Sequence, residues 1–138
     1  MLKYTQKKIF VTGATGFVGQ RLLFKLKNEG EKEIKVLARN SYPEYETVVC
    51  DLQSEVFSDD VLDGVETIFH LAGFAHDLRA SSKIEQIYRT VNIDATVRLA
   101  KLAVASGVKS FVFVSSVKAG GCDEDDVETQ PAGVYGQT

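Results

Sequence analysis

The sequence has 138 residues, with 16 Lys and Arg against 19 Asp and Glu, so its formal net charge is −3. Hydrophobic residues make up 44% and charged residues 25%, which is typical of one globular domain with its own core. The acidic balance leaves no basic face for nucleic acid or for a membrane surface. No apolar run approaches the roughly 20 residues of a membrane span, and the polar start, Met1 to Lys8, is not a signal peptide. With two cysteines and no disulfide framework, we expect a reduced, cytoplasmic protein.

Short β-branched runs alternate with segments in which apolar residues recur at steps of three and four, the spacing of a buried helix face. In chain order, the sequence predicts a strand at 9–11, a helix at 18–26, strands at 34–38 and 47–50, a weaker helix at 56–62, a strand at 67–72, a long helix at 84–106 and a strand at 111–114. Gly30, Gly64 and Gly107 follow the three helices, where a residue that tolerates positive φ is favoured.

The predicted strands are nearly continuous apolar runs, which is typical of a parallel sheet covered by helices on both faces. Crossovers between parallel strands are almost always right-handed, so few topologies remain, and a doubly wound sheet fits best. We therefore predict an α/β fold in three layers, with the sheet between two layers of helices.

A glycine-rich turn joins the first strand to the first helix. Its glycines are Gly13, Gly16 and Gly19, three residues apart. We expect Gly13 to permit the tight turn, Gly16 to let a pyrophosphate approach the backbone, and Gly19 to pack the helix closely on the sheet. Phosphates would then lie at the helix N-terminus, facing free N–H groups and the positive end of the helix dipole. A turn between a strand and a helix is the context that this kind of motif requires.

Residues 12–19, TGATGFVG, resemble the TGxxGxxG signature of the extended short-chain dehydrogenase/reductase superfamily, which includes NAD-dependent epimerases and dehydratases. Later segments resemble the family's landmarks in the same order. They are HLAG at residues 70–73, Asn92 in the long helix, FVSS at residues 113–116, and YGQT at residues 135–138, which resembles the start of YxxxK. The resemblance implies a Rossmann fold, and we expect residues 1–138 to end before the last strands of that fold.

The resemblance also implies NAD(P) as the cofactor. The residues that it assigns to cofactor binding are Gly13, Thr15, Gly16, Phe17, Val18, Gly19, Arg39, Asp51, Leu52, Leu71, Ala72, Gly73 and Asn92.

Two of these residues have open alternatives. Arg39, twenty positions after Gly19, stands where an NAD site commonly has a carboxylate. Its guanidinium can pair with the 2′-phosphate of NADP or stack on the adenine, which favours NADP slightly, but Arg39 can also be a solvated residue at a strand end. Asp51 resembles an aspartate that contacts the adenine amino group in the family, and can equally begin a turn.

Tyr135 is the candidate acid/base, with Ser116 as the hydroxyl that binds the same substrate oxygen and Ser115 as the second choice. A phenol with a pKa near 10 is a poor base at pH 7, so the family uses a lysine four residues later to lower it. That lysine would be residue 139. We therefore expect residues 1–138 to be the NAD(P)-binding part of a longer enzyme, without its substrate domain and inactive alone.

The resemblance favours a nucleotide-sugar epimerase or dehydratase, because residues 115–121 resemble the SSxKxxG stretch of bacterial polysaccharide epimerases. The chemistry begins with hydride transfer from a sugar carbon. Two alternatives are an NADPH-dependent carbonyl reductase of the dihydroflavonol or steroid type and a regulatory NAD(P)-binding module without chemistry. The expected partner is a nucleotide sugar. The resemblance also implies a possible homodimer, because family members commonly dimerise through two helices, of which the long helix at 84–106 is the first.

Other reactive side chains are interpreted as structural. We expect the five carboxylates within residues 123–128 to be solvated and to hold no metal. His70, at the end of an apolar strand, should have a hydrogen-bonded structural role. Cys50 should be an inert core residue, and Cys122 has no nearby histidine that would make it a nucleophile.

Overall fold

Five short runs rich in β-branched and aromatic residues form one parallel sheet. A computed structural model describes residues 7–31, 33–73 and 82–115, and the following statements concern those residues. The strands are β1 (Lys8–Thr12), β2 (Ile34–Ala38), β3 (Glu46–Val49), β4 (Val65–His70) and β5 (Ser110–Phe113). Their order is β3-β2-β1-β4-β5, and every neighbouring pair is parallel.

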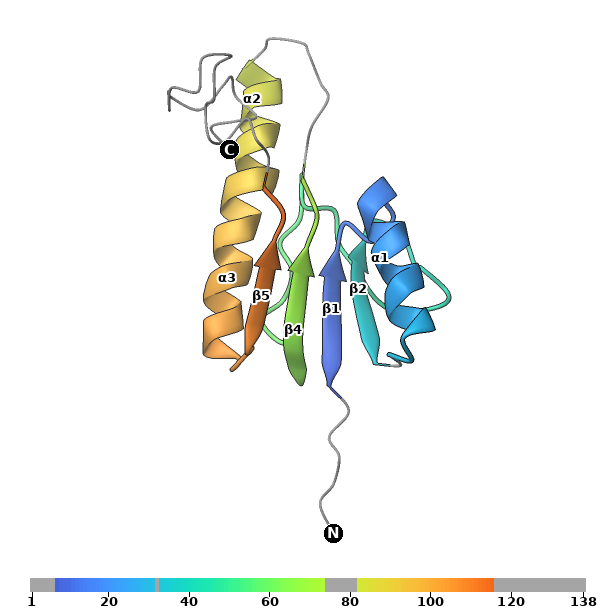
Figure 1. Ribbon diagram of the computed structural model, residues 1–138. Helices are drawn as coiled ribbons and strands as arrows, with labels where there is room; N and C mark the ends of the chain where they lie inside the picture. The colour runs from blue at the N-terminus through green and yellow to red at the C-terminus, as the bar shows by residue number, and fades with distance from the viewer. Residues whose placement is uncertain (1–6, 32, 74–81, 116–138) are drawn as a thin grey trace, which may run out of the picture.

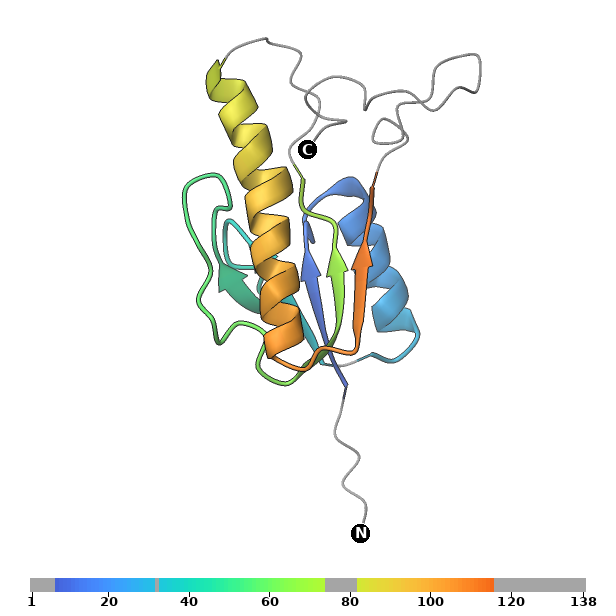
Figure 2. The same cartoon turned by 90° about the vertical axis from the view of Figure 1, so that its left-hand side faces the viewer.

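Helices cover both faces of this sheet (Figures 1 and 2). Helix α1 (Phe17–Asn28) follows β1 and packs on one face. On the other face lies a continuous helical segment made of α2 (Ser82–Tyr88), the π-helix η1 (Arg89–Asp94) and α3 (Ala95–Ala105). The predicted doubly wound fold in three layers is confirmed. No helix in the described ranges is long and apolar enough to cross a membrane.

The core consists of two clusters, one on each face of the sheet. On the α1 face, Val11 and Val36 are fully buried beneath Leu23. On the α3 face, Phe10 and Ile68 pack with Leu99. Alternate residues of β1 therefore enter different clusters, as expected for a strand that is buried on both sides.

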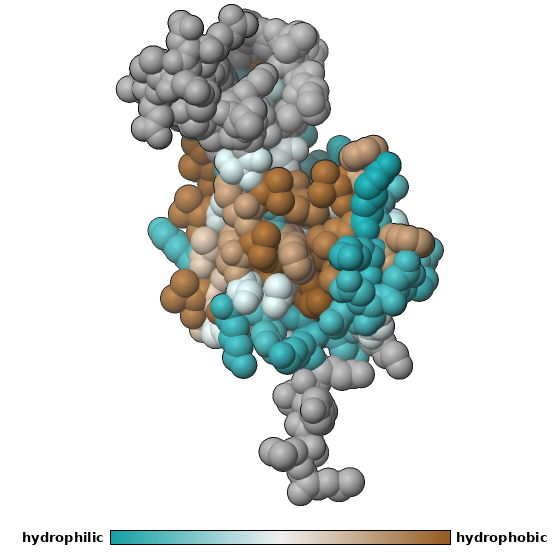
Figure 3. Space-filling model, in the orientation of Figure 1, coloured by the Kyte–Doolittle hydropathy of each residue, from teal (hydrophilic) through white to brown (hydrophobic). Residues whose placement is uncertain are grey.

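Part of the α1 face is apolar and has no described helix over it. Val112 of β5 and Val114 just beyond it are 42% and 53% exposed. Val112 pairs with Phe69 of β4, whose side chain contacts the α1-face cluster. Figure 3 shows the resulting apolar surface over β4 and β5 beside α1.

The predicted helix at 56–62 is wrong. Residues 52–54 and 59–64 form turns, and residues 55–58 have no regular structure. The apolar spacing is instead that of a loop packed under α3, in which Phe57, Val61 and Leu62 are buried in the core. Short polar side chains satisfy the local backbone here, as where the Asp51 carboxylate accepts the Gln53 N–H at 3.0 Å, and such bonds compete with helix formation. Gly64, with φ of +75°, therefore ends this loop and not the helix that the sequence predicts.

The long helix predicted at 84–106 is present, but with a different internal geometry. It begins at Ser82 and contains the π-helical turn η1, which buries Val91 and Asn92. Single π-turns inside α-helices are frequent at functional sites. Strand β4 also ends earlier than predicted, at His70, so residues 71–73 form a loop at the edge of the sheet.

The strand order determines where a crevice opens along this edge of the sheet. The chain moves from β1 outward through β2 to β3, and then crosses back to β4 on the other side of β1. The connections after β1 and β4 therefore leave the sheet in opposite directions and open a crevice at the carboxyl ends of the strands.

Candidate functional site

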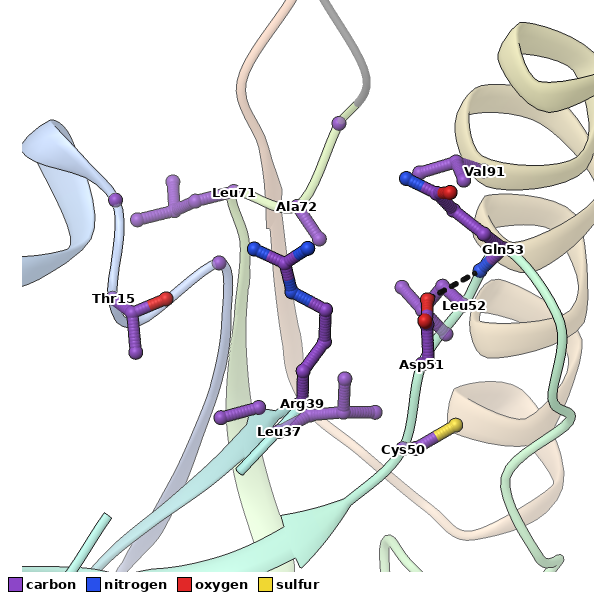
Figure 4. A pocket seen from close by; sticks show the side chains of 14 residues that line it. Thr15, Leu37, Arg39, Cys50, Asp51, Leu52, Gln53, Leu71, Ala72 and Val91 are labelled. Carbon is purple, nitrogen blue, oxygen red and sulfur yellow. Dashed lines mark hydrogen bonds between the residues drawn. The ribbon is translucent and has the colours of Figure 1, made fainter. Parts of the chain in front are cut away.

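A pocket of about 380 Å³ lies in this crevice (Figure 4). Loops after β1, β2, β3 and β4 and the π-helix η1 all contribute to it. The lining residues are Gly13, Thr15, Gly16, Leu37, Ala38, Arg39, Cys50, Asp51, Leu52, Gln53, Leu71, Ala72, Gly73 and Val91.

Two of the three glycines are required by the fold itself. Gly13 has φ of +68°, and a Cβ there would lie 2.6 Å from the backbone nitrogen of Ala72. A Cβ on Gly19 would lie 2.1 Å from the carbonyl oxygen of Gly13. Gly19 therefore packs α1 against the glycine turn, and the expectation that it packs on the sheet is corrected.

Gly16 differs from the other two. Its φ is −75°, which any residue adopts, and a Cβ there would meet only the Gly13 carbonyl oxygen, at 3.4 Å. The described protein therefore gives little reason for a glycine at this position. The space that a side chain would take belongs to the pocket.

Gly16 is also the N-cap of α1, and no side chain caps this helix. Its first turn holds no acidic residue. The free N–H groups of the first turn and the positive end of the helix dipole are thus left for an anion. The side chains of Phe17 and Val18 are 72% and 54% exposed and do not line the pocket, so only their backbone groups are candidates for a contact there.

The opposite wall comes from the ends of β2 and β3. The Arg39 side chain extends between the loop of Thr15 and the loop of residues 51–53 (Figure 4). Its guanidinium forms no hydrogen bond or ion pair with another described residue. Asp51 begins a turn, since its backbone oxygen accepts the N–H groups of Ser54 and Glu55. Asp51 also lines the pocket, so the two interpretations of this residue are compatible.

The third wall is the loop after β4. The Thr12 hydroxyl accepts the backbone N–H groups of Leu71 and Ala72, at 3.2 and 3.1 Å. These bonds hold the loop against the glycine turn. Gly73 approaches Asn92, whose Oδ1 would be 3.4 Å from a Cβ at residue 73. Asn92 itself is buried beside the pocket and does not line it.

The structure brings together most of the residues predicted to bind a cofactor and adds five. Predicted residues that line the pocket are Gly13, Thr15, Gly16, Arg39, Asp51, Leu52, Leu71, Ala72 and Gly73. The five lining residues that were not predicted are Leu37, Ala38, Cys50, Gln53 and Val91. The first four lie within two residues of a predicted site residue at a strand end, so their place in the sequence could have indicated them. Val91 enters through the π-turn, which the apolar spacing did not indicate.

Several candidates lie outside the described residues. They are Ser116, Tyr135, Cys122 and the carboxylates within residues 123–128. Their assigned roles, or lack of one, stay predictions.

His70 has the hydrogen-bonded structural role that the sequence indicated. Its ring is 1% exposed and contacts the Thr12 hydroxyl through Nδ1 at 2.6 Å and the Thr96 hydroxyl through Nε2 at 2.7 Å. Burial lowers the pKa of His70 to about 4, so the ring is neutral near pH 7. Cys50 is 3% exposed, and burial raises the pKa of its thiol, in agreement with an inert residue.

Comparison with known proteins decides the family. The family model "NAD dependent epimerase/dehydratase family" matches residues 9–138. The chain belongs to this family. The resemblance of the glycine turn and of the later landmarks to extended short-chain dehydrogenases/reductases is thereby confirmed.

Individual family members are similar over most of this chain. The UDP-glucose 4-epimerase of Vibrio cholerae is 34% identical over 120 residues, which are 83% of this chain and 36% of that protein. The 3-beta-hydroxysteroid dehydrogenase of Mycolicibacterium neoaurum is 32% identical over 127 residues, 84% of this chain and 34% of that protein. The solved structure "MoeE5 in complex with UDP-glucose and NAD" has a TM-score of 0.78 and 31% identity, covering 94% of this chain and 44% of that one. The chain thus spans about a third of the curated relatives and less than half of the solved structure.

The histidine predicts a pH dependence of stability. Because the folded pKa of His70 is depressed to about 4 from 6.5, its contribution is complete above pH 6.5 and is lost as the pH falls toward 4. A shift of this size corresponds to about 3 kcal/mol. In urea unfolding, the free energy of unfolding of the wild-type chain should therefore fall by about that much more than that of His70→Asn between pH 7.5 and 4.0. The carboxylates titrate in both proteins, so equal pH slopes would contradict the assignment.

Proposed function

We propose that the pocket binds NAD(P), with the pyrophosphate at the N-terminus of α1 and the adenosine between Arg39 and Asp51. The observation that carries this proposal is Gly16, a glycine for which the described fold gives little reason, at an uncapped helix N-terminus inside a pocket. Backbone N–H groups without a side-chain cap are suited to a phosphate. The solved structure of MoeE5 in complex with UDP-glucose and NAD, similar over 94% of this chain, supports NAD(P) as the ligand.

Arg39 supports a contact with the adenosine half of the cofactor. An exposed guanidinium without a described partner can form a bidentate pair with the 2′-phosphate of NADP or stack on the adenine of NAD. The pocket residues next to it at the strand end, Leu37 and Ala38, provide no carboxylate for the ribose hydroxyls. On these grounds the proposal includes a slight preference for NADP.

We propose further that the whole protein is an epimerase or dehydratase acting on a nucleotide sugar. Bound NAD(P) would supply reversible hydride transfer. In this proposal Tyr135 takes the proton of the substrate hydroxyl, and Ser116 hydrogen-bonds the same oxygen. A lysine four residues after the tyrosine would lower the pKa of the phenol for this step. The similarity to the epimerase of Vibrio cholerae supports this class.

The similarity to the hydroxysteroid dehydrogenase of Mycolicibacterium neoaurum favours a second candidate, a dehydrogenase or reductase of the steroid type. Both candidates use the same cofactor pocket. They differ in whether the protein needs a site for a nucleoside diphosphate, so binding of UDP-glucose by the complete enzyme, measured against a steroid, separates them.

The role of Gly16 is tested by replacing it with valine. We expect Gly16→Val to leave the fold intact by far-ultraviolet circular dichroism, because its φ is ordinary, and to weaken NAD binding at least tenfold, because the side chain enters the pocket. The matched control is Phe24→Ala, on the exposed side of the same helix, which should bind as the wild-type chain does. Unchanged binding by Gly16→Val would exclude the pyrophosphate from this position.

The role of Arg39 is tested by calorimetric titration of NADP⁺ and NAD⁺ into the wild-type chain and into Arg39→Ala. If Arg39 pairs with the 2′-phosphate, its loss should weaken NADP⁺ by about tenfold or more and NAD⁺ by much less. Arg21→Ala is the control, because Arg21 lies over the Phe17 ring on α1 and outside the pocket. Equal affinities of Arg39→Ala and the wild-type chain for both cofactors would remove Arg39 from the site.

A further inference from the structure

The imidazole of His70 connects three elements that the chain brings together only by folding. His70 is the last residue of β4, Thr12 is the last residue of β1, and Thr96 lies in the first turn of α3. The ring bridges the two hydroxyls, with contacts of 2.6 Å at Nδ1 and 2.7 Å at Nε2. The rings of Phe111 and Phe113 of β5 lie at centroid distances of 6.1 and 5.8 Å.

The hydrogen bonds of Thr12 favour one tautomer of this ring. A hydroxyl has two acceptor positions and one donor. The Ala72 N–H donates to the Thr12 hydroxyl at 3.1 Å, and the Leu71 N–H is shared between that hydroxyl and the Thr12 carbonyl oxygen, both at 3.2 Å. Because these N–H groups point at the hydroxyl oxygen, the favoured arrangement has Thr12 donating its proton to Nδ1 of His70, with the ring proton on Nε2 and directed at the Thr96 hydroxyl.

Each end of this bridge adjoins an element that lines the pocket. The Thr12 hydroxyl holds the backbone of Leu71 and Ala72, which forms one pocket wall and touches the glycine turn. Thr96 is two residues beyond η1, which carries the pocket residue Val91 and the buried Asn92. A chain of directed hydrogen bonds thus runs from the loop after β4, through His70, to the helix on the opposite side of the pocket.

From this geometry we propose that His70 is a positioning residue for the cofactor pocket. Its Nε2–H tautomer fixes the direction of the Thr12 hydroxyl and, through Thr96, the distance between the loop after β4 and η1. The inference rests on the proposed binding of NAD(P) in the pocket. No contact between His70 and the cofactor is required.

An apolar residue at position 70 would fill the same space between aromatic rings without this effect. In His70→Leu the Thr12 hydroxyl keeps its two incoming N–H groups but loses the acceptor for its own proton, in a position that is 1% exposed. An unsatisfied buried donor is costly, so the hydroxyl is expected to turn toward another acceptor and release the N–H of Ala72. In His70→Asn the side-chain oxygen can still accept the Thr12 proton, while the shorter side chain no longer reaches Thr96.

The test combines three variants with measurements of NAD affinity and of amide hydrogen exchange. We expect Thr96→Val and His70→Asn to weaken NAD binding by a similar factor, roughly threefold, because each removes the same hydrogen bond. The double variant should be no weaker than either single one. His70→Leu should weaken binding by roughly tenfold and accelerate hydrogen exchange at the Ala72 N–H.

The control is Ile34→Ala, which removes a buried side chain of the α1-face cluster at the first residue of β2, away from the carboxyl ends of the strands. It destabilises the fold without touching the pocket, so its NAD affinity should be that of the wild-type chain. If Ile34→Ala weakens NAD as much as His70→Leu does, the effect is one of general stability and the inference is wrong. The same holds if His70→Leu and Thr96→Val bind NAD as the wild-type chain does.

Nitrogen-15 spectra of the His70 ring give a readout that does not depend on any ligand. The geometry predicts a neutral ring with an unprotonated Nδ1 and a slowly exchanging Nε2–H at pH 7. A proton on Nδ1 would overturn the inference even if NAD binds. A folded wild-type chain that shows the expected tautomer but does not bind NAD would instead contradict the proposed function.

Discussion

The close approach of the turn after β1 to the loop after β4 is the constraint on which the site depends. These two connections leave the sheet in opposite directions, and between them Gly13 lies so near Ala72 that a Cβ would be 2.6 Å from its backbone nitrogen. Gly19 then allows α1 to start directly against the same turn. The helix N-terminus consequently points into the crevice at the switch point of the sheet, which is where doubly wound proteins bind their ligands.

Buried hydrogen bonds maintain this approach. The Thr12 hydroxyl holds the loop after β4, and His70 completes the bonding of that hydroxyl. All of these groups are neutral, which suits a buried position, because a charged histidine there would lose its hydration.

Much of this arrangement could be predicted from the sequence. The apolar runs predicted all five strands, and Ile34 to Ala38 match β2 at both ends, because strands buried on both faces leave an unbroken signal. The glycine spacing located the turn and most of the pocket. At Gly13 and Gly19 no larger residue fits, because a Cβ would collide with neighbouring backbone atoms. The helix at 56–62 was predicted wrongly because a loop that buries Phe57, Val61 and Leu62 has the same apolar spacing as a helix face. The π-turn and the tautomer of His70 depend on tertiary packing, which local sequence does not encode.

The most direct test of nucleotide binding at the glycine turn is a backbone amide spectrum of the chain titrated with NAD⁺ and NADP⁺. Binding there predicts saturable shifts at Gly16, Phe17 and Val18 and at Ala72, with no change at Lys27, at the other end of α1. Saturable shifts confined to the hollow formed by Lys27, Glu44 and Glu46, with an unchanged glycine turn, would contradict it.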